Sequence, residues 1–201
     1  VYRPFKGDPV LFDGSPWVGG LPFEWNFDYS AAGFERSFLD STMRLGLNRI
    51  DLLVIHDLDK SYHGKSVSNK LQELETGMEW LKMMKNSAAI QAFGAGINDI
   101  EMIPLFLEHF ELDFFLVAMP YTLLNQETLE DIFPECERRG IGVIIGSPYA
   151  SGILAGGSRK ESKYGYAAVS EEMLKKVQSI EVICEDHGIP LKAAALQFPL
   201  A

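Results

Sequence analysis

The feature that most constrains the fold is an alternation of short apolar runs with longer segments of helical periodicity, which begins at Tyr29. Short apolar runs are typical of strands that are buried on both faces of a parallel sheet. Because each run is followed by a helical segment, the pattern predicts parallel strands joined by helical crossovers. The predicted strands are residues 50–55, 90–96, 113–119 and 141–145.

The helical segments carry their own boundary signals. Ser30 is placed to cap the first helix, and Gly46 is placed to end it. Gly140 ends a later helix in the same way, and Ser170 begins another. The predicted helices are residues 30–46, 65–86, 99–110, 127–139, 170–187 and 191–198, with a polar loop at 151–168.

The first 28 residues follow neither pattern. They contain four prolines and seven aromatic residues, and they have no apolar periodicity. We expect a long loop, and a loop of this length in a compact domain is usually functional. The predicted organisation is one partial barrel domain over residues 1–201, with an aromatic-rich loop at 1–28 and β/α repeats at 29–201.

Two α/β architectures fit such an alternation, an open doubly wound sheet and a (β/α)8 barrel. A dinucleotide-binding open sheet requires G-x-G-x-x-G after its first strand. Gly94-Ala95-Gly96 supplies two of the glycines and lacks the third. The sequence therefore favours a (β/α)8 TIM-type barrel, of which about four strands and their helices are present. Because a complete barrel needs about 250 residues, we expect this chain to be part of a longer protein.

Composition excludes some partners and favours one compartment. A net charge of -10 and a pI of about 4.9 disfavour nucleic-acid binding, because phosphate backbones are also negative. The apolar runs are too short to span a membrane, and the first residues do not resemble a signal peptide. Cys136 and Cys184 are expected to be free thiols, which indicates the cytoplasm.

Functional groups of a barrel gather where strands end. His56 directly follows the first predicted strand. A histidine there either acts in proton or hydrogen-bond chemistry or is a core residue bonded to a carbonyl. Asp57 and Asp59 follow it and could bind sugar hydroxyls or belong to a solvated loop. We predict no metal site, because neighbouring strand residues point to opposite faces and no other histidine ends a strand.

Polar groups also follow two other predicted strands. Asn98 could pair with an amide of a ligand or cap the next helix. Ser147, Tyr149 and Ser151 belong to a stretch whose hydroxyl and N–H groups suit a phosphate, although an ordinary turn has the same composition.

Several of these segments resemble one known family. Residues 37–56 read SFLDSTMRLGLNRIDLLVIH, which is similar to a segment of the aldo-keto reductases. The stretches IHDLD at 55–59, YTLLNQ at 121–126 and SPYASGIL at 147–154 resemble the same family. The details are most similar to the branch of D-threo-aldose 1-dehydrogenase, L-fucose dehydrogenase and pyridoxal 4-dehydrogenase.

The resemblance implies roles for individual residues. His56 matches the histidine that orients the reacting oxygen, and Asn98 matches the residue that holds the nicotinamide carboxamide. Ser147, Tyr149 and Ser151 match the loop over the cofactor pyrophosphate. The family's catalytic tyrosine, lysine and aspartate are expected before Val1.

Three positions depart from the family pattern. Ile97 replaces the usual serine, Ala118 the usual glutamine, and Gly146 the aromatic residue that stacks on the nicotinamide.

The resemblance therefore implies an oxidoreductase that uses NAD or NADP on an aldose or a similar small carbonyl or alcohol. Trp17 and Trp25 are expected either to wall the substrate pocket or to pack the first loop onto the barrel. One alternative is a barrel that binds a partner or a nucleotide without turnover, because the tyrosine and lysine are not in this sequence. Another is a metal-dependent hydrolase.

Overall fold

A computed structural model describes residues 2–15, 19–159, 161–165 and 167–200 of the chain, so Trp17 lies outside the described residues. The chain divides into two compact units. One comprises Val1–Leu53 and Leu58–Phe93, and the other comprises Val54–Asp57 and Gly94–Ala201. The predicted single domain over residues 1–201 stays a prediction.

The first unit is mainly helical. Its longer helices are α1 (Ala31–Leu45) and α3 (Val67–Asn86), and α2 (Lys60–His63) is followed by the 3-10 turn η2 (Gly64–Ser66). The predicted boundaries of α1 are confirmed: the Ser30 hydroxyl accepts from the Gly33 N–H, and Gly46 closes the helix with a left-handed φ of 64°. The Trp80 ring of α3 packs 6.5 Å from Phe34 and 6.0 Å from Phe38, ring centre to ring centre.

The segment predicted as a long loop is largely irregular, but it contains elements that the sequence did not reveal. Strands β1 (Tyr2–Pro4) and β2 (Phe23–Trp25) pair antiparallel, with Tyr2 opposite Trp25, and η1 (Pro9–Leu11) is a 3-10 turn. Local periodicity cannot predict this pairing, because the two strands are three residues long and far apart in the sequence.

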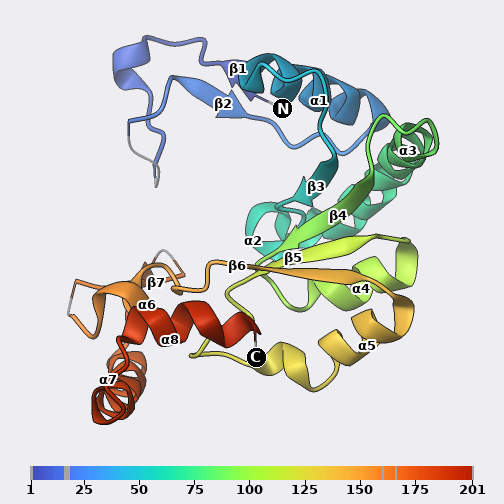
Figure 1. The fold of residues 1–201 in the computed structure, drawn as a ribbon. Helices are drawn as coiled ribbons and strands as arrows, with labels where there is room; N and C mark the ends of the chain where they lie inside the picture. The colour runs from blue at the N-terminus through green and yellow to red at the C-terminus, as the bar shows by residue number, and fades with distance from the viewer. Residues whose placement is uncertain (1, 16–18, 160, 166, 201) are drawn as a thin grey trace. The chain divides into compact units, whose positions relative to one another are not determined.

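A four-stranded parallel sheet carries the predicted alternation. The strands are β3 (Leu52–His56), β4 (Ala92–Ile97), β5 (Phe114–Ala118) and β6 (Gly142–Gly146), hydrogen-bonded in that order. In the second unit, α4 (Met102–His109) joins β4 to β5, and η3 (Glu127–Leu129) and α5 (Ile132–Arg139) join β5 to β6 (Figure 1). The predicted α/β class is thereby confirmed.

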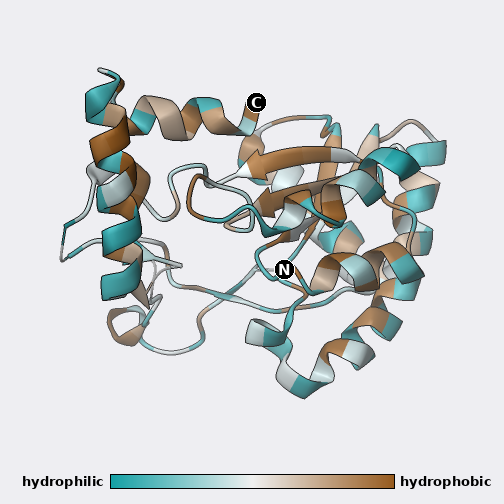
Figure 2. Ribbon diagram, turned by 90° about the horizontal axis from the view of Figure 1, so that it is seen from below, coloured by the Kyte–Doolittle hydropathy of each residue, from teal (hydrophilic) through white to brown (hydrophobic). Residues whose placement is uncertain are grey.

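The two faces of this sheet differ in burial. Alternate side chains such as Ala95, Phe115 and Val117 are buried, and the Phe115 ring packs 6.3 Å from Phe106 of α4. The residues between them point to the other face. On that face Val54 and Ile144 are 39% and 42% exposed, although the strands are mainly hydrophobic in Figure 2.

The remainder of the second unit follows β6. It contains α6 (Ile153–Gly156), β7 (Lys163–Tyr164) paired with β8 (Ala167–Ala168), α7 (Glu171–Asp186), α8 (Leu191–Gln197) and η4 (Phe198–Leu200). The prediction of a plain loop at 151–168 was wrong for α6 and the β7–β8 hairpin, because elements of two to four residues show no periodicity. Both cysteines are free, as predicted; both are also buried, and burial raises the pKa of the Cys136 thiol. None of the helices in the described ranges is long and apolar enough to cross a membrane.

Candidate active site

His56 is the last residue of β3, and its side chain is 61% exposed. It lies two residues beyond Val54, on the partly exposed face of the sheet. Its Nδ1 atom lies 2.8 Å from Oδ1 of Asp57, whose side chain is 21% exposed. The histidine is therefore an accessible group held by a less accessible carboxylate, and it is not a buried core residue.

Asp57 reaches the ring through an uncommon backbone conformation. Successive strand residues point to opposite faces, and the sequence argument therefore placed Asp57 away from His56. The structure corrects that argument: the φ of Asp57 is 56°, in the left-handed region, and its carboxylate meets the histidine. Aspartate tolerates this region better than most residues do, but nothing in the sequence marks the change.

Gly96 of β4 gives the His56 ring its space. A Cβ atom at Gly96 would lie 2.9 Å from Cδ2 of His56 and 3.1 Å from Cγ1 of Val54. Carbon atoms do not approach that closely without something moving. The sequence indicated Gly96 only as part of an incomplete dinucleotide motif, so its contact with His56 was missed.

Asn98 follows β4 directly, and its side chain is exposed. The strand register places Ile97 opposite Val117 and Val117 opposite Ile145, so the next row holds Asn98, Ala118 and Gly146. With strands about 4.8 Å apart, this row extends about 10 Å from β4 to β6. One exposed amide and two very small residues thus share the carboxyl edge of the sheet.

The loop after β6 begins at this edge. Ser147 and Ser151 are exposed and adopt left-handed φ angles of 52° and 60°. Between them Ala150 is fully buried in a core cluster that includes Ile153 and Leu154 of α6. Tyr149 is partly buried against the same cluster. The buried residues anchor the loop while the two hydroxyl groups remain exposed.

Residues with strained backbone conformations cluster at the same carboxyl edge of the sheet. Of the six non-glycine residues with positive φ in the described ranges, only Ala88 lies elsewhere; the others are Asp57, Met119, Ser147, Ala150 and Ser151. Such conformations cost free energy and persist where the surrounding structure enforces them, which is often at functional sites.

Asp59 belongs to the first unit, where it caps α2. Its Oδ1 accepts hydrogen bonds from the Ser61 N–H, the Tyr62 N–H and the Ser61 hydroxyl, and the residue is buried. The structure thus gives Asp59 a structural role.

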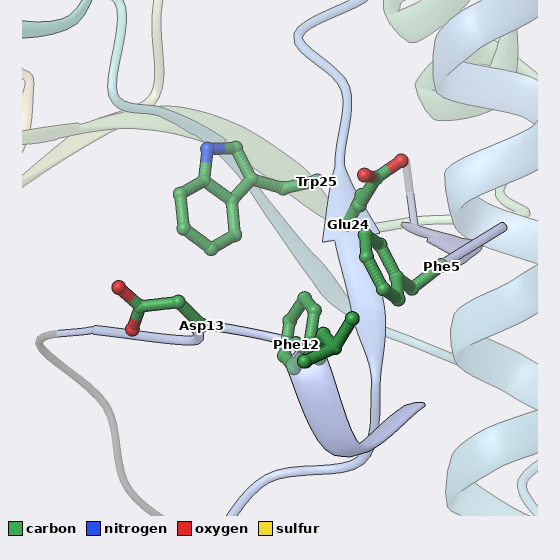
Figure 3. Close-up of a pocket in the computed structure, with 6 residues that line it drawn as sticks. Phe5, Phe12, Asp13, Glu24 and Trp25 are labelled. Carbon is green, nitrogen blue, oxygen red and sulfur yellow. The ribbon is translucent and has the colours of Figure 1, made fainter. Parts of the chain in front are cut away.

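Trp25 also belongs to the first unit, where it lines an open pocket of about 500 Å³. Figure 3 shows its indole extending from β2 toward the side on which the Asp13 carboxylate lies. The other lining residues are Phe5, Leu11, Phe12 and Glu24.

Among the residues that the structure describes, no group of three or more histidine, cysteine, aspartate or glutamate side chains could hold a metal ion.

Comparison with known proteins places the chain in a family. The profile of the aldo/keto reductase family matches residues 18–201. The chain belongs to the aldo/keto reductase family. This match confirms the family resemblance seen in the sequence and the predicted partial (β/α)8 barrel.

Curated relatives include two dehydrogenases. The chain is 37% identical to pyridoxal 4-dehydrogenase of Microbacterium luteolum, over 92% of this chain and 55% of that protein. It is 32% identical to D-threo-aldose 1-dehydrogenase of a Pseudomonas species, over 88% of this chain and 51% of that protein. The chain thus spans about half the length of the curated relatives it matches.

Solved structures of aldo-keto reductases share the fold. A glycerol dehydrogenase from Gluconobacter oxydans matches with a TM-score of 0.64 and 21% identity, over 92% of this chain and 57% of that chain. A holo aldo-keto reductase from Bacillus halodurans matches with a TM-score of 0.62 and 23% identity, over 87% of this chain and 54% of that chain. These similarities support a TIM-type barrel, of which this aldo-keto reductase chain contains four strands.

Proposed function

We propose that this chain is part of an NAD(P)-dependent oxidoreductase that acts on an aldose or a similar small carbonyl or alcohol. The observation that carries the proposal is the placement of His56, Asn98 and the Ser147–Ser151 loop at the carboxyl ends of β3, β4 and β6. The active sites of TIM barrels are built at this edge. The names of the two dehydrogenase relatives support the substrate class.

The residues at this edge fit a dinucleotide. The exposed Asn98 amide can pair with a carboxamide, since each group offers a donor and an acceptor. The hydroxyl groups of Ser147, Tyr149 and Ser151 can donate to a pyrophosphate. Ala118 and Gly146, which lie between these groups, present no bulky side chain to obstruct a ring. The bound nicotinamide would supply the hydride chemistry.

His56 would orient the reacting oxygen of the substrate. An exposed imidazole at a strand end can donate or accept a hydrogen bond at that oxygen, and orientation of this kind contributes to rate. Trp25, and Trp17 outside the described residues, are proposed to contact the substrate, and the aromatic and acidic pocket beside Trp25 supports a polyhydroxylated ligand. The cytoplasm is the proposed compartment, supported by the two free thiols.

The test is a spectrophotometric assay of the full-length protein with NAD or NADP. Aldoses and pyridoxal would be the substrates, and the absorbance of the reduced cofactor would be followed. We expect turnover that a chelator does not affect. Cofactor binding without turnover of any substrate would favour the non-catalytic barrel, and loss of activity with a chelator would favour a metal-dependent enzyme.

The cofactor site has a separate test in binding. Replacing Ser147 and Ser151 together with alanine should weaken the binding of NAD(P), measured by quenching of protein fluorescence. Ser179→Ala is the matched control, because this exposed hydroxyl lies on α7 and bonds only a carbonyl of its own helix among the contacts in the described ranges. Equal affinities of the double variant and the control would contradict the assigned cofactor loop.

A further inference from the structure

We propose that Asp57 is a positioning residue for His56, which fixes a proton on Nδ1 and presents Nε2 to the substrate oxygen. The contact itself is observed in the structure, and its role in turnover rests on the proposed function. This role differs from the sugar-binding role that the sequence indicated for Asp57.

The short contact with Asp57 indicates which ring nitrogen of His56 carries the proton. Oδ1 of Asp57 lies 2.8 Å from Nδ1 of His56, and an ionised carboxylate can only accept. A proton shared between these two atoms must therefore belong to Nδ1. In the neutral ring Nε2 is then an acceptor, suited to a substrate hydroxyl; in the protonated ring it is a donor, suited to a carbonyl oxygen.

The backbone conformation is what makes the contact possible. In an extended strand Asp57 would point to the face opposite His56. Its φ of 56° turns the carboxylate back to the histidine, in a region that few residues other than glycine adopt. An unfavourable conformation of this kind persists where the surrounding structure enforces it, often as part of a functional site.

The ring is restrained from a second direction by β4. The absent Cβ of Gly96 would lie 2.9 Å from Cδ2 and 3.5 Å from Nε2 of His56. The edge of the ring that carries these two atoms therefore lies against the backbone of Gly96, while Nδ1 meets Asp57. Two neighbouring groups thus limit both the position and the rotation of the imidazole, and the partner of one ring nitrogen determines the state of the other.

The kinetic test separates positioning from binding of sugar hydroxyls. Full-length wild type and Asp57→Ala would be assayed with an aldose and with a simple substrate that lacks the additional hydroxyls. Positioning predicts that kcat falls about 10- to 100-fold on both substrates, with little change in KM. A higher KM for the aldose alone would overturn the proposal and favour sugar binding.

A second comparison excludes general structural damage. Asp57→Ala should cause no further loss in a His56→Ala background, because a residue that acts through His56 has no effect without it. Asp51→Ala is the matched control, since Asp51 precedes β3 and pairs with Arg49. An undiminished effect of Asp57→Ala in the double variant would overturn the proposal.

An NMR measurement tests the contact independently of activity. Long-range ¹H–¹⁵N spectra distinguish protonated from unprotonated ring nitrogens of histidine. We expect the neutral His56 ring of the wild type to carry its proton on Nδ1, and Asp57→Ala to shift the proton toward Nε2. A wild-type proton on Nε2, or spectra unchanged by the substitution, would overturn the proposal. If the expected spectra are found in a protein without NAD(P)-dependent turnover, the proposed function fails and the Asp57–His56 contact stands.

Discussion

At the scale of single residues, the candidate site depends on the position of the His56 imidazole ring. The Asp57 carboxylate contacts one edge of the His56 ring at 2.8 Å, and Gly96 leaves room for the other edge. The contact with Gly96 can be changed by a substitution that alters no polar group. It can therefore be tested separately from the chemistry of the ring.

We therefore expect Gly96→Ala to lower kcat by about 10- to 100-fold, because a displacement of about 1 Å can cost that much. The new methyl group would lie 2.9 Å from the His56 ring and would have to push it away. Gly142→Ala on β6 is the matched control, because its added Cβ would meet its nearest neighbours at 3.6 Å, an ordinary contact. Steady-state kinetics of the full-length variants checks this, and equal kcat values for Gly96→Ala and wild type would contradict it.

At the scale of elements, side chains cap helix termini and form ion pairs along helices. The Asp59 carboxylate caps α2 through two backbone N–H groups and the Ser61 hydroxyl. Because this buried carboxylate already accepts these hydrogen bonds, we expect Asp59 to stabilise α2 and not to bind a sugar.

We expect Asp59→Ala to lower the free energy of unfolding by about 1 kcal/mol, the usual value of an N-cap, and to leave the KM for an aldose unchanged. Asp59→Asn is the matched control, since its amide oxygen can still accept from the same N–H groups. Denaturant unfolding and steady-state kinetics measure the two quantities. A raised KM with unchanged stability would instead support the sugar-binding role.

Helix α5 contains an ion-paired cluster with a defined pH dependence. Hydrogen bonds from Arg138 and Arg139 lower the pKa of Glu135 from 4.5 to about 2. Arg139 also donates to the Leu107 carbonyl of α4, so the cluster connects two helices.

Because the folded-state pKa of Glu135 is the lower one, its contribution to stability is present above pH 4.5 and is lost as the pH falls toward 2. The stability difference between wild type and Glu135→Gln should therefore shrink over that range. An NMR titration of the Glu135 carboxyl checks the cause, since Arg138→Met should raise its pKa toward 4.5. A carboxyl that titrates at 4.5 in the wild type would contradict this account.

The elements also show what the sequence could and could not predict. Regular elements with strong local signals were predicted, such as α1 between Ser30 and Gly46 and the four strands of the sheet. The β1–β2 pairing and α6 were missed, because pairing over a long separation and single helical turns leave no periodic pattern. The left-handed turn at Asp57 was missed because it reverses the alternation on which the argument depended.

At the scale of the whole molecule, the chain is an aldo-keto reductase sequence that spans about half the length of its curated relatives. The candidate residues His56, Asn98 and Ser147 follow or end strands β3, β4 and β6 at one edge of one sheet, which spans about 14 Å from β3 to β6 at the usual strand spacing. The sequence predicted this clustering, because parallel strands place all their carboxyl ends at one edge. It also identified Ala118 and Gly146 as departures from the family pattern, but only the strand register shows that these two small residues lie opposite each other at that edge.

The most direct test of the account is hydride transfer by the full-length protein with and without the His56 imidazole. The rate would be measured in a single turnover with NAD(P) and an aldose, alongside the Kd of the cofactor. We expect His56→Ala to lower the rate by about 100-fold or more and to leave the Kd unchanged, because His56 is proposed to contact the substrate oxygen and not the dinucleotide. An unchanged rate in His56→Ala, or no hydride transfer by the wild type, would contradict an active site at this edge of the sheet.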